Sequence, residues 1–141
     1  MSAASNYLEN KVLDHVLGEG ARNFTSPATL YVALFKDTGT GTLANLELGT
    51  LTDEISSSGT AYGRQTIDFS AASSGSASSS ATVTWSTATA NWGTVTAVAV
   101  MDGGTVGAGN VLFYGNLSVS KVIETGDTFQ IASTNLTVSL A

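Results

Sequence analysis

Short runs of apolar residues, separated by glycine, serine and threonine, follow the one proline of this chain, Pro27, and continue to its end. Segments such as SATVTWS and NLTVSL place apolar side chains at every second position, which is the period of a β-strand. About seven to nine such strands can be assigned after Pro27, with no second long helical pattern among them. Many short strands joined by Gly/Ser turns predict a mainly β fold, a single β-sandwich or jelly-roll-like domain.

The segment ATLYVALFKD, at 28–37, is apolar on both faces of a predicted strand. Each face receives three apolar side chains: Leu30, Val32 and Leu34 on one, and Tyr31, Ala33 and Phe35 on the other. A strand with this pattern is expected at the centre of a sheet or covered on both sides.

A single helical pattern, SNYLENKVLDHVLGEG, precedes the strands. Its apolar residues recur at helical spacing: Leu8, Val12, Leu13, Val16 and Leu17. Ser5 or Asn6 can cap its start, and Gly18 or Gly20 can end it. A helix of about three turns is marginal alone, so it must dock its apolar stripe on its own sheet or on a neighbouring subunit. We expect one domain over 1–141, with the helix in 1–20 and the β-sandwich over 28–141.

Two long segments between the predicted strands are rich in small residues. Residues 38–61 form an excursion of Gly, Thr and Leu, in which a short strand is expected around 46–51. Residues 70–80 contain only Ser, Ala and Gly, which predicts a flexible connection or a segment that lies flat on a partner.

The glycine-rich stretch DGGTVGAGN, at 102–110, is similar at first sight to a phosphate-binding loop. Such a loop ends a strand and begins a helix, whose amide groups hold the phosphate. Here VLFYG continues as another strand, and Leu112 occupies the position of the third glycine. The stretch therefore predicts a turn between two strands, and we expect no nucleotide and no other cofactor.

Charge is sparse and mostly negative. Charged residues make up 11% of the chain, and five basic residues against eleven acidic ones give a net charge of −6. The basic residues are scattered, whereas a nucleic-acid binder needs a basic stripe, so we expect no nucleic-acid partner. No run approaches the roughly 20 apolar residues of a membrane span, and Glu9, Lys11 and Asp14 do not suit a signal peptide. We therefore expect a protein that is made and kept in the cytoplasm, or that leaves it by a route other than cleavable secretion, and we expect no membrane partner.

Catalytic and metal-binding side chains are few. The chain has one histidine, His15, and no cysteine, so a nucleophile would have no evident base and a thiolate zinc site is excluded. An oxygen-ligand calcium site stays open, but the aspartates are better explained as turn and cap residues: Asp37, Asp53, Asp102 and Asp127. We expect neither an enzyme nor a metal site.

Five aromatic residues leave a second binding alternative open. They could form a platform on which sugar rings stack, as in carbohydrate-binding modules: Tyr31, Phe35, Trp85, Trp92 and Tyr114. Their positions within predicted strands favour core packing or a subunit contact instead.

Several segments, taken in order, resemble a family of small virion proteins of tailed bacteriophages. These are the helix SNYLENKVLDHVLG, the strand YVALF, YGRQTIDF, ATANWGTVTAVAVMD and LFYGNLSVSKVIETGDTFQIASTNLTVSL. The resemblance runs from about residue 5 to residue 140. Its most distinctive pieces are the YLEN of the helix, the WGTV that starts a strand, and GDTF near the end.

The resemblance implies a virion structural protein, with no catalytic motif to carry over. Its main implication is a capsid decoration (cement) protein, commonly a homotrimer, that binds the outside of the head and bridges subunits of the major capsid protein. The expected location is then the virion, on the capsid surface. A tail or tail-fibre component, or a carbohydrate-binding β-domain for host attachment, are the alternatives.

Two segments are the expected contact surfaces with copies of the chain or with the shell. One is the N-terminal helix and the other is the loop 38–58. The predicted contact residues are Tyr7, Leu8, Val12, Leu13 and Val16 in the helix, and Leu46, Leu48 and Leu51 in the loop.

Overall fold

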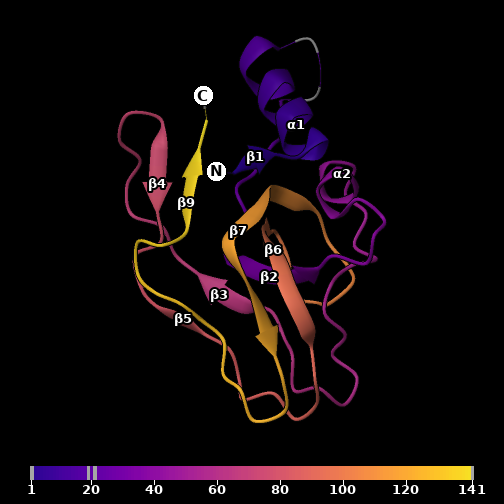
Figure 1. Ribbon diagram of the computed structural model, residues 1–141. Helices are drawn as coiled ribbons and strands as arrows, with labels where there is room; N and C mark the ends of the chain where they lie inside the picture. The colour runs from indigo at the N-terminus through magenta and orange to yellow at the C-terminus, as the bar shows by residue number, and fades with distance from the viewer. Residues whose placement is uncertain (1, 19, 21, 141) are drawn as a thin grey trace.

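The computed structural model describes residues 2–18, 20 and 22–140 of the chain (Figure 1). It confirms the predicted mainly β fold with a short N-terminal helix. The elements are β1 (Ala3–Ala4), α1 (Asn6–Leu17), β2 (Leu30–Lys36), α2 (Thr42–Glu47), β3 (Gln65–Ile67), β4 (Ser76–Ser78), β5 (Val83–Thr84), β6 (Gly93–Met101), β7 (Val111–Ile123), β8 (Gln130–Ile131) and β9 (Thr137–Ser139).

One antiparallel sheet organises the molecule, in the order β1-β7-β6-β2-β3. Two small two-stranded sheets accompany it, β4 with β9 and β5 with β8. The larger core cluster contains residues of β2 and β6 together with residues of β5 and β8, so it lies between the main sheet and a second, less regular β layer. This layering agrees with the predicted sandwich, whereas the jelly-roll arrangement stays a prediction.

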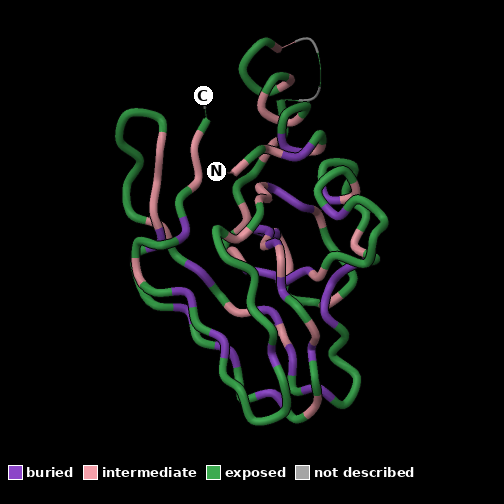
Figure 2. The backbone as a smooth tube through the Cα atoms, viewed as in Figure 1, coloured by how far each residue is buried: buried purple, intermediate pink, exposed green. Residues whose placement is uncertain are grey.

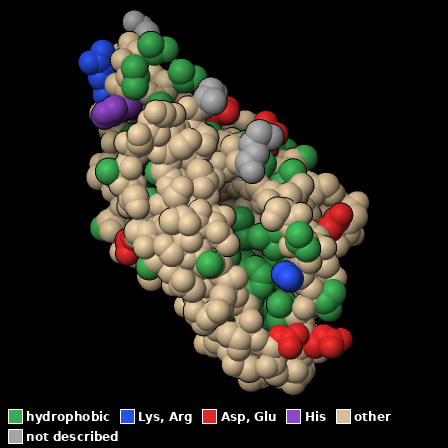
Figure 3. Space-filling model, turned by 60° about the vertical axis from the view of Figure 1, so that its left-hand side comes forward, with side chains coloured by type: hydrophobic (Ala, Val, Ile, Leu, Met, Phe, Trp, Pro, Cys, Tyr) green, Lys and Arg blue, Asp and Glu red, His purple; other side chains and the backbone are tan. Residues whose placement is uncertain are grey.

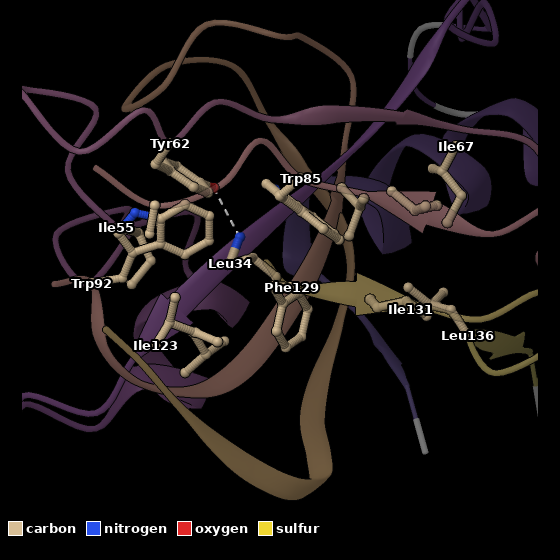
Figure 4. Packing of buried hydrophobic residues seen from close by; sticks show 14 of the residues in the cluster. Leu34, Ile55, Tyr62, Ile67, Trp85, Trp92, Ile123, Phe129, Ile131 and Leu136 are labelled. Atoms are coloured by element: carbon tan, nitrogen blue, oxygen red, sulfur yellow. Dashed lines mark hydrogen bonds between the residues drawn. The ribbon is translucent and has the colours of Figure 1, made fainter. Parts of the chain in front are cut away.

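Strand β2 is covered on both sides, as its sequence predicts. Val32 and Leu34 belong to the larger cluster, and Ala33 and Phe35 belong to a smaller cluster on the opposite face. The larger cluster contains two edge-to-face aromatic pairs, Tyr62–Trp92 with ring centroids 5.4 Å apart and Trp85–Phe129 at 5.2 Å (Figure 4). Pairs of this kind contribute about 0.5–1.5 kcal/mol each beyond the burial of their area.

Residues 38–61 contain a helix where a short strand was expected. The prediction of a strand around 46–51 is wrong, because α2 occupies Thr42–Glu47 and a turn follows it. Leu46 is fully buried in the smaller cluster, while Leu43 and Leu48 are exposed. Helix α2 has only six residues. Its apolar spacing is too short to distinguish a helix from a strand by periodicity.

Residues 70–80 are part of the fold, and the expectation of a flexible connection is wrong. Strand β4 pairs with β9, and Ser79 is fully buried. Hydroxyl groups extend the backbone ladder across the two strands, with Ser76 Oγ 2.7 Å from Ser139 Oγ and Ser78 Oγ 2.9 Å from Thr137 Oγ1. Hydrogen bonds, rather than apolar burial, hold this polar segment.

The glycine-rich stretch is a turn between two strands, as predicted. It joins β6 to β7, which pair antiparallel, and Gly107 and Gly109 adopt φ values of 77° and 84°. The Asp102 carboxylate fixes the turn by accepting hydrogen bonds from the backbone N–H and side-chain Nδ2 of Asn110, both at 2.7 Å.

Candidate interaction surfaces

Helix α1 begins and ends where the sequence predicts. The Ser5 Oγ accepts a hydrogen bond from the Leu8 N–H at 3.3 Å and donates one to the Val111 carbonyl. The backbone N–H of Ser5 also donates to the Leu112 carbonyl at 2.9 Å, which ties the start of α1 to β7. Gly18 ends the helix in the left-handed conformation, with φ 84°.

The apolar stripe of α1 is largely bare. Leu8 is the buried residue of the helix, and the side chains of Tyr7 and Val12 are half-buried. Leu13, Val16 and Leu17 are 54%, 69% and 69% exposed. The helix extends beyond the sheet at one end of the molecule, and most of it is coloured exposed in Figure 2. The first turn of α1 therefore packs on its own chain, and the last turns present their apolar side chains to the surroundings.

The loop 38–58 is organised around the buried carboxylate of Asp53. Its Oδ1 accepts hydrogen bonds from the hydroxyls of Thr38 and Thr40, the latter at 3.1 Å. Its Oδ2 accepts from Thr40 at 3.0 Å, Thr42 at 2.9 Å and Asn45 Nδ2 at 3.4 Å. Burial acts to raise the pKa of Asp53, but these hydrogen bonds favour the ionised form and hold the pKa below its ordinary value of 3.8.

The predicted contact residues of this loop lie in different environments. Leu46 is fully buried within its own chain, and Leu51 is partly buried against the same cluster. Leu48 is 72% exposed, which makes it the accessible residue of the three.

A buried ion pair joins the same loop to the turn between β6 and β7. Arg64 donates to Glu54 through Nε at 2.7 Å and Nη2 at 2.8 Å, and Nη1 donates to the carbonyls of Gly103 and Ala108. The Gly107 N–H also donates to Glu54, at 2.7 Å. Both charged side chains are almost fully buried and hydrogen-bonded within the chain, so they act as a structural clamp.

Tyr62 completes this clamp. Its hydroxyl accepts a hydrogen bond from the Leu34 N–H at 2.9 Å and donates to Glu54 at 3.2 Å. Burial, followed by the negative charge of Glu54, raises the pKa of Tyr62 above its ordinary value. Tyr62 is therefore a buried structural phenol that connects β2 to the ion pair.

A groove of ≈ 500 Å³ runs between β7 and the segment 129–138. Hydrophobic side chains gather in a hollow of this face in Figure 3. Apolar lining residues include Val98, Val100, Phe113, Phe129, Ile131 and Leu136. Polar lining residues include Asn116, Gln130, Asn135 and Thr137. Among the residues that the structure describes, Lys121 is the one charged residue of the lining. This shape and polarity suit an apolar ridge with a polar border more than a highly charged ligand.

The groove was not anticipated from the sequence. Its lining comes from β6, β7, β8 and β9, so no single local pattern marks it. Val119 of β7 lines the groove and is 65% exposed, but this exposure follows from the fold and is not visible in the sequence.

The described residues bring together no arrangement typical of an active site. His15 is exposed on α1. No group of three or more His, Asp or Glu residues that could hold a metal ion occurs within 2–18, 20 and 22–140. Within the same residues, no helix has the length and apolarity needed to cross a bilayer.

The proposed sugar platform is not formed. Phe35, Trp85 and Trp92 are almost fully buried, and the Trp92 Nε1 donates to the Thr60 carbonyl at 2.8 Å. These aromatic faces pack in the core, as their positions within strands favoured, and are not open to a sugar ring.

A family model described as podophage GP4 fiber I protein gp80 matches residues 3–139. The chain therefore belongs to this family of phage fibre proteins, and it is a phage structural protein of the virion. No curated protein matches the sequence. The family description supports the tail-fibre alternative better than capsid decoration, which was the main implication of the sequence resemblance.

Proposed function

We propose that this protein is a non-catalytic structural component of a podophage tail fibre, which works by binding copies of itself and a neighbouring fibre protein. The match to a fibre family over residues 3–139 is the observation on which this proposal depends. The match covers nearly the whole chain, including α1 and the strands that line the groove.

The surface chemistry supports an assembly role. The chain has a low charged fraction of 11%, and it leaves large apolar side chains exposed on α1 and β7. Exposed apolar patches with a polar border are typical of protein–protein contact sites. Several modest contacts of this kind can hold a multi-copy structure, because each bound contact raises the effective concentration for the next.

Capsid decoration is the second candidate, and the sequence resemblance is the observation that favours it. In that case the major capsid protein would be the partner, and the same apolar surfaces would lie against the head. The two candidates differ in location, not in the kind of chemistry.

Deletion of the gene in the phage separates the two candidates. If the tail-fibre proposal is right, the mutant particles have intact, DNA-filled heads, but their tail fibres are missing or shortened in negative-stain micrographs. Complementation with the wild-type gene should restore the fibres. Fragile heads with normal fibres would contradict the proposal and favour capsid decoration.

A further inference from the structure

Each chain carries one bare apolar ridge and one bare apolar groove. The ridge consists of Leu13, Val16 and Leu17 on the last turns of α1. The groove lies between β7 and the segment 129–138. We propose that the ridge of one copy docks in the groove of a second copy. This inference deepens the proposed self-association and depends on it.

The course of the chain directs the ridge away from the groove of the same copy. Strand β1 pairs with β7 at Ala3↔Tyr114 and Ala4↔Phe113, and Ser5 then bonds to Leu112. The chain thus runs toward the start of β7, whereas the groove follows β7 from 113 toward 121. In Figure 1, α1 continues beyond the end of the sheet, and its capped start fixes this direction. A second copy is therefore needed to bring the two surfaces together.

The ridge has the pattern of a groove-binding helix, and it is short enough to lie along the groove. Leu13, Val16 and Leu17 follow the i, i+3, i+4 spacing with which an amphipathic helix occupies an apolar groove. The part of α1 from Glu9 to Leu17 spans about 12 Å at about 1.5 Å per residue. The part of β7 from 115 to 121 spans up to about 20 Å at about 3.3 Å per residue, and the groove follows it.

Charge gives the docking a direction. Lys121 is exposed, and within 2–18, 20 and 22–140 it is the one charged residue that lines the groove. Glu9 is exposed on α1 four residues before Leu13, so it lies on the same side of the helix as the ridge. When the ridge enters the groove with Glu9 toward Lys121, opposite charges meet at the border. An exposed pair of this kind contributes about 0.2–1 kcal/mol, which orients the contact without dominating it.

Docking of a ridge on one surface into a groove on another is a head-to-tail contact. Contacts of this kind close into rings if the rotation between copies allows it, and otherwise continue as filaments. In a closed ring of three copies, every ridge would lie in the groove of the next copy. This arrangement agrees with the homotrimer expected from the sequence resemblance.

Two complementary variants test the proposal in sedimentation-velocity experiments on the full chain over a concentration series. The ridge variant is Leu13→Glu with Leu17→Glu, and the groove variant is Val119→Glu with Lys121→Glu. All four side chains are exposed, so far-UV circular dichroism should match the wild type. Leu48→Glu is the matched control, because Leu48 is 72% exposed, somewhat more than Leu13 and Leu17, but lies outside both surfaces.

We expect the wild type and the Leu48→Glu control to form closed oligomers, and each variant alone to sediment as a monomer. An equimolar mixture of the two variants should form dimers, because the intact ridge of the groove variant meets the intact groove of the ridge variant. This rescue is specific to a ridge-in-groove contact.

Several results would overturn the docking proposal. They are a monomeric wild type at every concentration, an oligomer that persists in either variant, or a mixture that stays monomeric. An oligomer that persists in the groove variant would indicate ridge-to-ridge contact. If the circular dichroism of a variant differs from that of the wild type, a charge exchange is tested in its place. It consists of Glu9→Lys and Lys121→Glu, made singly and together. Each single change should weaken association several-fold, and the double variant should restore it. If the effects of the two single changes simply add in the double variant, the Glu9–Lys121 contact between copies is contradicted. The gene-deletion experiment tests the tail-fibre role separately.

Discussion

Asp53 shows how single residues set the conformation of the long loop after β2. Its carboxylate collects three threonine hydroxyls and one amide, and it is almost fully buried. The Asp53→Ala variant should lower the free energy of unfolding by about 2 kcal/mol, since hydrogen bonds to a charged group contribute about 1.5–3 kcal/mol each and some are regained with water. Urea unfolding at neutral pH measures the change, and Asp68→Ala, on an exposed side chain outside the loop, is the control.

The same residue predicts a pH dependence. Because the pKa of Asp53 is lower in the folded protein than its ordinary value of 3.8, the unfolded chain binds this proton more readily. The stabilisation is therefore fully present above pH about 4 and is lost as the pH falls through the folded value. Unfolding curves at pH 5 and pH 3 should show a smaller decrease in stability for Asp53→Ala than for the wild type. Equal decreases would contradict the assigned hydrogen bonds.

The buried Arg64–Glu54 pair makes a different residue-scale prediction. Arg64→Met leaves an uncompensated buried carboxylate and should cost about 3–5 kcal/mol, whereas Arg64→Met combined with Glu54→Gln should cost clearly less than the two single changes added together. Thermal unfolding of the three variants measures this coupling. Full additivity would show that the two side chains do not stabilise one another.

His15 provides the residue-scale test of the non-catalytic proposal. The His15→Ala variant should leave the assembly and the infectivity of the phage unchanged, because this side chain is exposed on α1 and forms part of neither the ridge nor the groove. Infectivity that falls while particles assemble normally would reopen the question of an activity.

At the scale of elements, α1 was predictable and α2 was not. Helix α1 is long enough to show its period, and Ser5 and Gly18 mark its ends in the sequence. Helix α2 is too short for a period, and it depends on Asp53, whose hydrogen bonds come from side chains 8 to 15 residues away along the chain. Strand β4 escaped prediction because its partner β9 lies about 60 residues further on, and its residues carry no apolar signal. Local sequence patterns reveal an element whose own apolar residues show a clear period. They miss an element that is stabilised by partners far away along the chain.

The cap of α1 carries the element-scale prediction. Ser5→Ala removes the acceptor for the Leu8 N–H and the donor to the Val111 carbonyl, so it should lower the free energy of unfolding by about 1–2 kcal/mol. It should also loosen the attachment of α1 to β7, detectable as faster amide hydrogen exchange in α1. Ser120→Ala, on an exposed side chain of β7 outside the groove, should change neither quantity.

At the scale of the whole molecule, the strand pattern predicted the mainly β architecture, but the accessible surface could not be derived from it. The sequence placed possible contacts at Leu8 and Leu46, which the fold buries, as well as at Leu13 and Val16, which it exposes. The groove arises where strands from distant parts of the sequence meet. Contact surfaces of this kind depend on which side of each element the fold covers, and that is decided by tertiary packing.

The location of the chain in the virion tests the central claim most directly. Electron cryomicroscopy of the intact phage should allow the five-stranded sheet, with α1 extending from one end, to be fitted into density of the tail fibre, in several copies that contact one another. Density for the same fold on the head lattice, with none in the fibre, would contradict the account.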